Sequence, residues 1–461
     1  MRWLRTTQRS FFLLGGAVAG ALCGVATIFL VASATARTTT AAGVFDVMHV
    51  PPLLTMPGET AELAYDVHCA PAGVEDPEAR CSVQGTVFAR AAGEPGFQAI
   101  ALEPAGDGSA QLVASLPRAL IGSPRFEYYA VVESPDLDAR VTLPAAGATA
   151  PTVSRRLDEA IAVPLGRHAF GASLASGQRI VSARWGDGPA EVGLESRPSS
   201  GAPIGASAFD VDATGSVAVL DHARRRLLRW TSDASAPERV PLSINGTIAD
   251  LATATDGSLY VLETTSRDGR PPLVRRFDVD GRELEATEIA EREAAQIRIG
   301  PEGPVVLQRP SHQWMPLMVA GRPASQAEQR RRARVGRQLR SGGEVVVLRH
   351  GNELRVALLA RGALVRSWRI TSATPLGEVQ LAEPLGACFV VVVRVYDEGR
   401  DEFAVLVLDR RGLVSRTSLV PAEWAEGAPF GRFRLVGRSL FRLGSTPTGI
   451  FVDRHDLEVR R

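Results

Sequence analysis

The sequence predicts an all-β chain in which a β-sandwich is followed by a β-propeller, and two patterns carry this prediction. The first is a glycine at a tight turn followed by a short apolar or β-branched run, clearest at residues 256–262 (DGSLYVL). It recurs every 38 to 51 residues, a period typical of propeller blades. The second is a stretch of alternating strands, interrupted by Pro and Gly about every ten residues, which is typical of an antiparallel sandwich. The recurring glycines are Gly177, Gly215, Gly257, Gly303, Gly343, Gly386 and Gly437.

Length and composition limit the class of protein. At 461 residues the chain can hold two or more domains, each with its own core. The formal net charge of +1 gives no general attraction to nucleic acid, so we expect no nucleic-acid partner. All 52 basic residues are arginine, a bias typical of high-GC bacterial genomes.

Residues 1–36 are predicted to be a signal anchor or a signal peptide. Arg2, Arg5 and Arg9 precede residues 11–31, which carry no charge. As a helix this run would rise about 30 Å, enough to cross a bilayer. Small residues at positions 32, 34 and 36 also offer signal-peptidase sites. We favour a single-pass membrane anchor because the apolar run is long. Cleavage would leave a secreted or periplasmic protein, and both alternatives place the rest of the chain outside the cytoplasm.

The cysteines fit that compartment. Cys69 and Cys81 are twelve residues apart and flank a polar, Pro-rich loop. In an oxidising space a disulfide is the expected state of such a pair. A metal site would require four closely spaced ligands, and only His68 adjoins the pair.

Residues 37–44 are expected to be a short linker, residues 45–143 the sandwich, and residues 144–159 a second linker. At residues 59–68 the apolar Ala61, Leu63, Tyr65 and Val67 alternate with mostly polar residues, so one face should pack and the other meet water. The run at 112–134, with RVTLP at 140–144, resembles the second half of immunoglobulin-like or fibronectin III-like modules of bacterial surface proteins. The resemblance implies a spacer or partner-binding unit and brings no catalytic residues.

Residues 160–461 are predicted to form the propeller. Each period has an inner strand before the glycine turn, a second strand after it, a third strand that ends on a large residue, and a fourth that leads back. Seven glycine turns predict seven blades, and the isolated strand at 160–165 would complete the last blade and close the ring. Six blades are the alternative if the Gly177 or Gly303 period is a decorated loop.

The blade at 208–230 resembles the NHL class of propellers. It has a D-x-x-G turn at 212–215, the strand VAVLD at 217–221 and an Arg-rich start to the third strand. Lactonase and lyase members of propeller families use inward-facing Glu, Asn and Asp at the axis. This chain has two Asn residues, which weakens an enzymatic interpretation.

The chain's polar loop residues gather on one predicted face. Loops that join strands two to three and four to one emerge together, and such a face surrounds the central funnel where propellers bind ligands. The alternative is that polar residues simply belong in loops. No two histidines have a metal-ligand spacing, so we expect no cofactor and leave a metal undecided. The candidate ligand-binding residues are His168, Asp221, His222, Glu263, Arg309, His312, His350, Asp397 and Glu398.

The densest charge feature is residues 330–340, with six arginines in eleven positions. It could bind an acidic or phosphate-rich polymer. Because no aromatic residue is interleaved, we favour a solvated loop or outer strand.

Two hypotheses for function follow. The first is a non-enzymatic binding protein of the bacterial cell envelope, which recognises a protein, peptide or glycan through a propeller face. The second is a lactonase-like hydrolase or lyase that acts at the propeller axis. We favour binding because catalytic residue types are scarce where the fold would place them.

Overall fold

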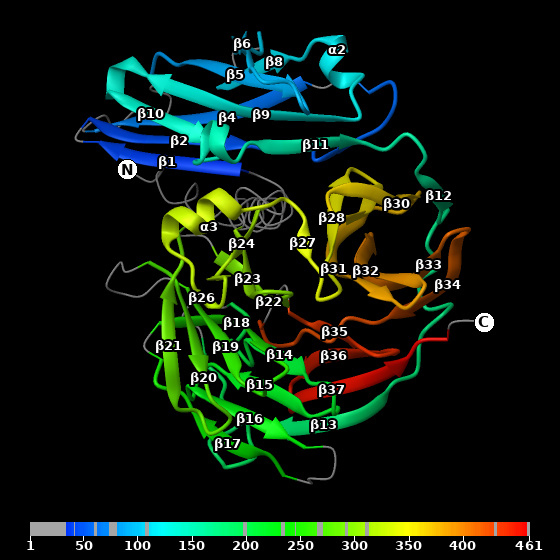
Figure 1. Ribbon diagram of the computed structural model, residues 1–461. Coiled ribbons are helices and arrows are strands. Elements are labelled where there is room, and N and C mark those ends of the chain that lie inside the picture. The colour runs from blue at the N-terminus through cyan, green and yellow to red at the C-terminus, as the bar shows by residue number, and fades with distance from the viewer. Residues whose placement is uncertain are drawn as a thin grey trace, which may run out of the picture.

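The computed structural model describes residues 34–40, 42–59, 62–72, 81–106, 110–196, 201–231, 236–244, 246–264, 271–290, 294–308, 313–427 and 431–458 (Figure 1). The predicted all-β class is confirmed, with a sandwich that lies against the rim of a ring of small sheets. Most of the predicted signal or anchor segment, and Arg309 and His312, lie outside the described residues. Within them, no helix combines the length and apolarity that a bilayer span requires.

Two sheets form the sandwich. Their strand orders are β1-β2-β4-β8-β7 and β3-β11-β9-β5-β6, and β10 also pairs with β9. The strands are β1 (Ala34–Thr40), β2 (Gly43–His49), β3 (Leu54–Thr55), β4 (Glu62–Pro71), β5 (Gln84–Ala91), β6 (Gln98–Ala101), β7 (Glu103–Pro104), β8 (Gln111–Ser115), β9 (Arg125–Ser134), β10 (Ala139–Leu143) and β11 (Thr152–Arg156). Three short helices are α2 (Arg118–Ile121), η1 (Pro135–Leu137) and η2 (Gly147–Thr149).

The sandwich extends beyond its predicted limits at both ends. Residues 37–44, expected to be a linker, belong mostly to β1 and β2. The second expected linker contains β11, which pairs with β9 and with β3. The inward positions of β11 include Thr152 and Ser154, so its alternation is polar and carries no hydrophobic signal.

A buried histidine lies in the sandwich core. The ring of His49 stacks on Tyr65, with ring centroids 4.3 Å apart. Its Nδ1 lies 2.7 Å from the carbonyl oxygen of Ala64 and its Nε2 lies 2.8 Å from the hydroxyl of Tyr128. Both bonds are satisfied when Nδ1–H donates to the carbonyl and the tyrosine hydroxyl donates to Nε2, which is the neutral imidazole. Burial lowers the pKa of His49 to about 4.

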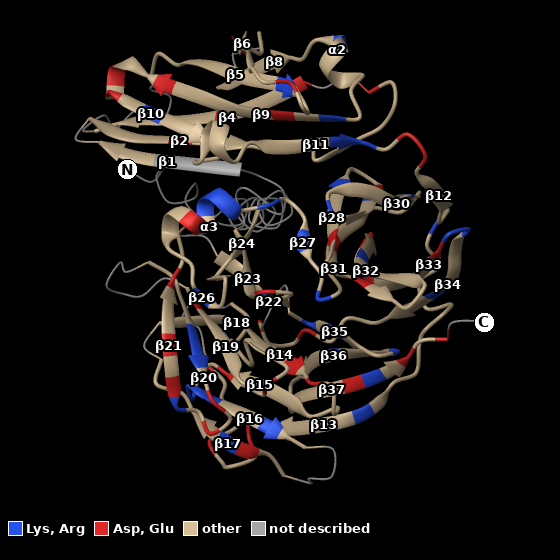
Figure 2. Cartoon of the chain, in the orientation of Figure 1, with Lys and Arg blue, Asp and Glu red and all other residues tan. Residues whose placement is uncertain are grey.

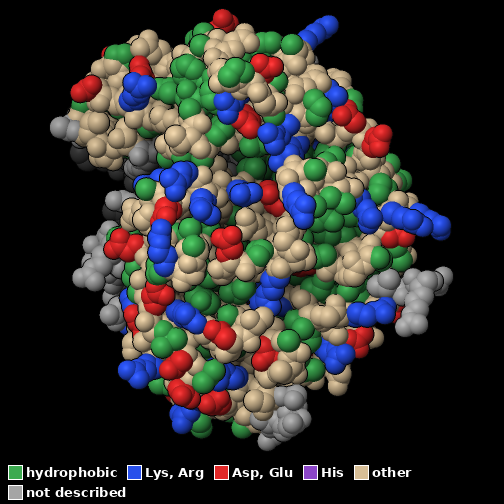
Figure 3. All heavy atoms as spheres, in the orientation of Figure 1, with side chains coloured by type: hydrophobic (Ala, Val, Ile, Leu, Met, Phe, Trp, Pro, Cys, Tyr) green, Lys and Arg blue, Asp and Glu red, His purple; other side chains and the backbone are tan. Residues whose placement is uncertain are grey.

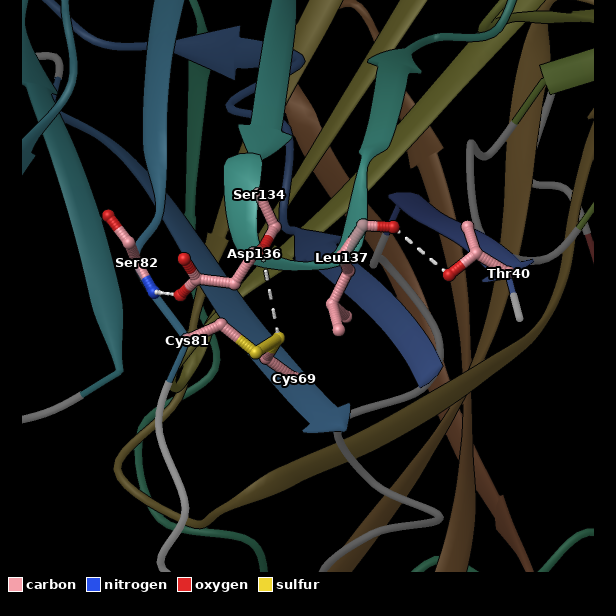
Figure 4. The surroundings of a disulfide bond; sticks show 7 residues. All are labelled: Thr40, Cys69, Cys81, Ser82, Ser134, Asp136 and Leu137. Atoms are coloured by element: carbon pink, nitrogen blue, oxygen red, sulfur yellow. Dashed lines mark hydrogen bonds between the residues drawn. A yellow bond between two sulfur atoms is a disulfide. The ribbon is translucent and has the colours of Figure 1, made fainter. Parts of the chain in front are cut away.

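The predicted disulfide between Cys69 and Cys81 is confirmed (Figure 4). It joins the end of β4 to the segment before β5. The backbone N–H of Ser82 donates to the carboxylate of Asp136, which ties the same segment to η1. A disulfide in this position indicates an oxidising, extracytoplasmic compartment.

The described residues of the propeller form six blades, which is the alternative count. Each sheet runs outward from an inner strand. Blade 1 is β14 (Ala208–Val211), β15 (Val217–Asp221), β16 (Arg226–Trp230) and β17 (Glu238–Pro241), and blade 2 is β18 (Thr247–Thr253), β19 (Leu259–Thr264), β20 (Leu273–Phe277) and β21 (Glu283–Glu288). Blade 3 is β22 (Ala294–Gly300), β23 (Gly303–Gln308) and β24 (Gln313–Pro316), followed by the hairpin β25 (Met318–Val319) and β26 (Arg322–Pro323) and by helix α3 (Gln326–Arg332). Blade 4 is β27 (Arg337–Gln338), β28 (Gly343–His350), β29 (Glu353–Ala360), β30 (Ala363–Thr371) and β12 (Ile161–Pro164). Blade 5 is β31 (Leu376–Leu385), β32 (Cys388–Asp397), β33 (Arg400–Asp409) and β34 (Gly412–Leu419), and blade 6 is β35 (Phe433–Val436), β36 (Ser439–Thr446), β37 (Gly449–Asp456) and β13 (Gln178–Arg184).

The blades close into a ring around one axis (Figure 1). The inner strands β14, β18 and β22 contact one another in turn, as do β31, β35 and β14. Contacts of β24 with β27 and of β28 with β31 complete the circle. Apolar side chains fill the spaces between neighbouring blades, for example between blades 4 and 5 and between blades 5 and 6.

The chain that leaves the sandwich runs along the outer edges of three blades, and we call residues 161–184 the belt. Its first strand, β12, pairs in parallel with β30 of blade 4. Leu174 then forms a parallel bridge to Ser418 of blade 5. The belt ends in β13, which pairs antiparallel with β37 of blade 6. The belt thus adds an outermost segment to blades 4, 5 and 6 in succession.

The belt corrects two sequence predictions. The last blade does lack a fourth strand of its own, but β13 supplies it and the strand at 160–165 does not. The Gly177 period is not a blade, because β13 leads into a long loop and only then into β14. Gly177 does not lie in a turn, so no turn conformation requires a glycine there. The ring of His455 lies against it, and an added Cβ would come 2.5 Å from Cε1 of that ring.

The sandwich packs against blade 4. Leu53, Leu54 and Leu157 join a buried apolar cluster with side chains of β28 and β29. Within this contact Arg355, 3 % exposed, donates to the carbonyl oxygen of Leu54 (2.6 Å) and to Glu59 (2.8 Å). The other face of blade 4 packs on blade 5. The sandwich therefore covers the blade 4 face that points away from blade 5.

Replacing Gly177 by Ala is expected to destabilise the propeller. The added methyl group meets the buried imidazole of His455, and overpacking of this kind costs about 1–3 kcal/mol. Thermal unfolding measures the change. The double variant Gly177→Ala with His455→Ala should recover part of the loss that each single change causes. Gly96→Ala is the control, because a Cβ at Gly96 has no atom within 4 Å. Equal melting temperatures for Gly177→Ala and wild type would contradict this role.

Lowering the pH from 6.5 to 5 is expected to destabilise the sandwich through His49. The folded pKa lies below the unfolded value of 6.5, so the unfolded chain binds a proton that the folded chain does not. This contribution to stability is therefore complete above pH 6.5 and is lost as the pH falls toward 4. By pH 5 the loss is about 2 kcal/mol, since each pKa unit corresponds to about 1.4 kcal/mol. Amide hydrogen exchange in β2 and β9, corrected for the intrinsic rate, measures it. His49→Gln should flatten the dependence, and equal slopes in both proteins would refute the assignment.

Candidate functional site

Three of the predicted ligand-face carboxylates lie at the ends of second strands, as expected, and the structure pairs each one within its own blade. The third strand returns directly beside the second, which brings an arginine next to each carboxylate. Burial raises the pKa of Asp221, and the neighbouring guanidinium opposes that shift. These carboxylates hold the strand ends together. The pairs are Asp221 with Arg226 (2.8 Å), Glu263 with Arg275 (2.6 Å) and Asp397 with Arg400 (3.2 Å).

The predicted histidines are spread over different parts of the ring. His168 lies in the belt and is buried, with Nε2 2.7 Å from the carboxylate of Glu402 in blade 5. His222 follows β15, and its Nε2 is 4.0 Å from Glu195. His350 ends β28 and lies 3.3 Å from Arg355, beside the sandwich. Among the described residues no group of three His, Cys, Asp or Glu side chains is arranged to hold a metal ion.

The predicted face residues therefore do not converge on one point where the structure describes them. Glu398 is an exposed turn residue with φ of 41°. Asp397 also contacts Arg167 of the belt (3.4 Å). That these residues bind a common ligand stays a prediction.

The arginine-rich segment divides into two groups. Arg330 donates to the carbonyl oxygen of Ala290, Arg337 to that of Ala382, and Arg340 to that of Thr253 in blade 2. Arg331, Arg332 and Arg334 are exposed. Helix α3 carries blue in Figure 2, and on the face shown in Figure 3 basic side chains gather along the boundary between sandwich and propeller. Half of the segment thus has a structural role.

Four charges at the propeller axis were not predicted as a group. Arg434 on the inner strand of blade 6 donates from Nε to Asp210 in blade 1 and from Nη2 to Asp250 in blade 2, both at 3.1 Å. Arg298 in blade 3 contacts the other oxygen of Asp250 at 2.6 Å. The side chains of Arg434 and Asp250 are 9 % and 3 % exposed. One ionic network therefore links four blades at the axis.

Backbone groups complete this network. Arg434 also donates to the carbonyl oxygens of Gly431 and Phe433. The N–H of Thr253 donates to Asp210 at 2.7 Å, and that of Ile297 donates to Asp250 at 3.1 Å. Burial lowers the pKa of Arg434, while the two carboxylates oppose the shift. The charges of the network are thus paired, and both carboxylates also accept backbone hydrogen bonds.

The sequence does contain a signal for the network. The inner strands of blades 1, 2, 3 and 6 each contain an apolar run broken by one charge, in the segments AFDV, IADLAT, QIRI and FRLV. Burying a charge is costly unless it is paired, so a charge that recurs on strands which meet at one axis predicts partners there. The relation becomes visible only when the blades are counted correctly.

Two long loops contribute exposed residues to the ligand face. One joins β13 to β14 and the other joins β34 to β35, and we call their described residues 185–196, 201–207 and 420–427 the loop platform. They brace each other, because the N–H of Gly205 donates to the backbone carbonyl oxygen of Glu426 (2.8 Å) and the N–H of Glu426 donates to the carbonyl oxygen of Pro203 (2.7 Å). Trp185 and Trp424 lie with ring centroids 6.1 Å apart, and Trp424 is 39 % exposed. A small cavity beside Trp185 is also lined by Ala425, Arg432 and Ser445, among other residues.

Comparisons with known proteins give likeness at low identity. No family model matches the chain, and no curated protein matches it. Virginiamycin B lyase from Staphylococcus aureus aligns over 55 % of this chain and 96 % of its own, at 8 % identity and a TM-score of 0.35. Hydrazine synthase from Kuenenia stuttgartiensis aligns over 51 % and 75 %, at 14 % identity and 0.32. A glucose dehydrogenase aligns over 62 % and 100 %, at 12 % identity and 0.34. Likeness at this level carries no argument about activity.

Replacing Arg434 by Met is expected to open the ring at its axis. The change leaves Asp210 and Asp250 with one arginine between them in a buried site, and breaking such a pair costs about 3–5 kcal/mol. Urea unfolding measures the loss. Arg454→Met removes an exposed pair with Asp456 and should have little effect. Adding Asp210→Asn and Asp250→Asn to Arg434→Met should restore part of the stability. A loss no larger than that of Arg454→Met would show that the network does not hold the blades.

Proposed function

We propose that the protein is a non-enzymatic binding protein of the extracytoplasmic compartment, which recognises a protein or peptide partner through the loop platform. The observation that carries the proposal is the exposed Trp424 beside Trp185 on two mutually braced loops. Tryptophan is enriched at the centres of protein interfaces because it offers a large rigid surface with few rotatable bonds. A braced platform also loses little conformational entropy on binding.

The position of the platform supports this proposal over an enzyme at the axis. The charges of the Arg434 network on the inner strands are paired with one another, whereas Trp424 lies on the surface. Asp221 and Glu263, which a lactonase-like site would recruit, are already bonded to arginines within their blades. The disulfide supports the compartment, and the sandwich holds the propeller at a fixed orientation through Arg355 and the apolar cluster around Leu54.

Binding of peptide and glycan arrays by the full-length protein tests the proposal. Trp424→Ala should lower the signal of the bound ligands about tenfold, which is the size expected for an interface hot spot of 1–2 kcal/mol. Leu284→Ala is the matched control, because Leu284 is an apolar residue with 52 % exposure on the outer strand of blade 2. It should leave binding unchanged.

Two results would contradict the proposal. One is ligand binding that Trp424→Ala and Leu284→Ala affect equally. The other is turnover of small lactones by the purified protein that persists in Trp424→Ala and is lost when Asp250 is replaced by Asn.

A further inference from the structure

We infer that the exposed arginines at the end of helix α3 bind the phosphate groups of anionic lipids at a membrane surface. These residues are Arg331, Arg332 and Arg334, and we call them the arginine patch. All three are exposed, and their side chains have no hydrogen-bond or ion-pair partner among the described residues. The inference goes beyond the proposed function, because the patch lies outside the loop platform and uses different side chains.

The preceding part of helix α3 is fixed to the end of blade 2, which holds the patch in place. Gln329 is fully buried, and its side-chain amide donates to the carbonyl oxygens of Glu288 (2.8 Å) and Ala324 (3.1 Å). Its amide oxygen accepts from the N–H of Ala290 at 2.9 Å. Arg330 donates to the carbonyl oxygen of Ala290 at 2.7 Å. The inward side chains of the helix are thus bonded, and the patch meets solvent.

The positive charge of the patch is not balanced within its own segment. Glu328 is the single carboxylate in residues 325–334. It accepts from Arg322 (2.6 Å) and from the hydroxyl of Ser325 (2.9 Å), so it is already engaged. Arg334 is held through its backbone, which pairs with Trp314 of blade 3 in both directions. Three free guanidinium groups within four residues therefore form a fixed positive surface, and guanidinium matches the geometry of phosphate oxygens.

The patch lies at the boundary between sandwich and propeller. Val335, which follows Arg334, packs against the apolar cluster of this boundary, and Leu53 belongs to that cluster. The start of β1 is close to the same cluster. Ala34 pairs with His49, and His49 precedes Leu53 by four residues. Four residues span at most about 13 Å of extended chain.

This position favours a membrane as the source of the phosphate groups. The sequence predicts a membrane segment at residues 11–31, and Ala34 follows it by three residues, or about 10 Å of extended chain. A chain anchored there keeps the boundary close to lipid headgroups. Basic side chains gather along this boundary in Figure 3, and anionic lipid attracts such groups. Single-stranded nucleic acid fits less well, because no aromatic residue is interleaved in residues 330–340.

Reaction of the full-length protein with phenylglyoxal, which modifies free guanidinium groups, tests the inference. The protein is mixed with vesicles of phosphatidylcholine, with vesicles that also contain an equal share of phosphatidylglycerol, or with soluble polyphosphate. Peptide mass spectrometry then gives the reaction rate at each arginine. We expect the patch to react about threefold more slowly with the phosphatidylglycerol vesicles than with phosphatidylcholine alone. High salt should abolish the difference.

Arg239 is the matched control, because it is an exposed arginine on the outer strand of blade 1, far from the sandwich in Figure 1. Its reaction rate should be the same with both kinds of vesicle. Changing Arg331→Gln and Arg332→Gln together should remove most of the protection of Arg334, whereas Arg331→Lys with Arg332→Lys should keep most of it. The Gln variant should unfold at the wild-type temperature, because the side chains that it replaces have no partner.

Three results would overturn the inference. The first is equal reactivity of the patch with both kinds of vesicle. The second is protection of Arg239 to the same degree as the patch, which would reduce the effect to general charge attraction. The third is protection by polyphosphate alone, which would make a soluble acidic polymer the ligand. The outcome is separate from that of the proposed function, because Trp424→Ala should leave the protection of the patch unchanged.

Discussion

The ring depends on the ionic contact of Arg434 with Asp210 and Asp250. Inner strands that converge on one axis bring side chains from every blade into a space that water hardly reaches, and a charge placed there must find a partner. Arg434 spans blades 6, 1 and 2, and Arg298 extends the network to blade 3. These four side chains come from the described inner strands of blades 1, 2, 3 and 6. The belt runs along the outer edges of blades 4 and 5 and ends on blade 6. The belt and the Arg434 network therefore share blade 6, and together they reach all six blades.

The sandwich also helps to complete the ring. Where the structure describes it, blade 3 has three strands, and the inner strand of blade 4 is reduced to Arg337 and Gln338. The apolar side chains of β28 and β29 that face away from blade 5 are covered by Leu53, Leu54 and Leu157 of the sandwich and its connection. A buried Arg355 would be costly alone, and Glu59 and Glu353 pair with it. The sandwich thus completes the side of blade 4 and is more than an appended spacer.

The sequence was sufficient for the class of fold and for the disulfide, because both depend on local patterns. Strand alternation and glycine turns report on neighbouring residues, and Cys69 and Cys81 are separated by one short loop. The sequence was insufficient to predict which strand closes the ring. The choice between the strand at 160–165 and β13 depends on pairing between residues almost 280 positions apart, such as Gln178 and Arg454. Gly177 misled the count for a related reason. A glycine is needed at this position because the ring of His455 packs against it, and a turn pattern cannot reveal that contact. Asp221 and Glu263 were placed correctly at strand ends, but their arginine partners on the third strands decide what they do.

These contacts also explain why we propose a binding site on the loop platform, the least regular part of the propeller. In the repeating blades the charged side chains stabilise strand ends, the axis and the sandwich contact, so their chemistry is already engaged. The loop platform is different, since its own order comes from backbone pairing between Pro203, Gly205 and Glu426 and from close packing at glycines. A Cβ at Gly205 would come 2.6 Å from the ring of Trp185, and one at Gly427 would collide with the carbonyl oxygen of Ala206. Backbone and glycine packing hold the loops in place, and Trp424 is exposed on them. In the proposed function, a platform ordered in this way would bind with its conformational entropy already lost in folding, and affinity would then depend on what Trp424 contacts.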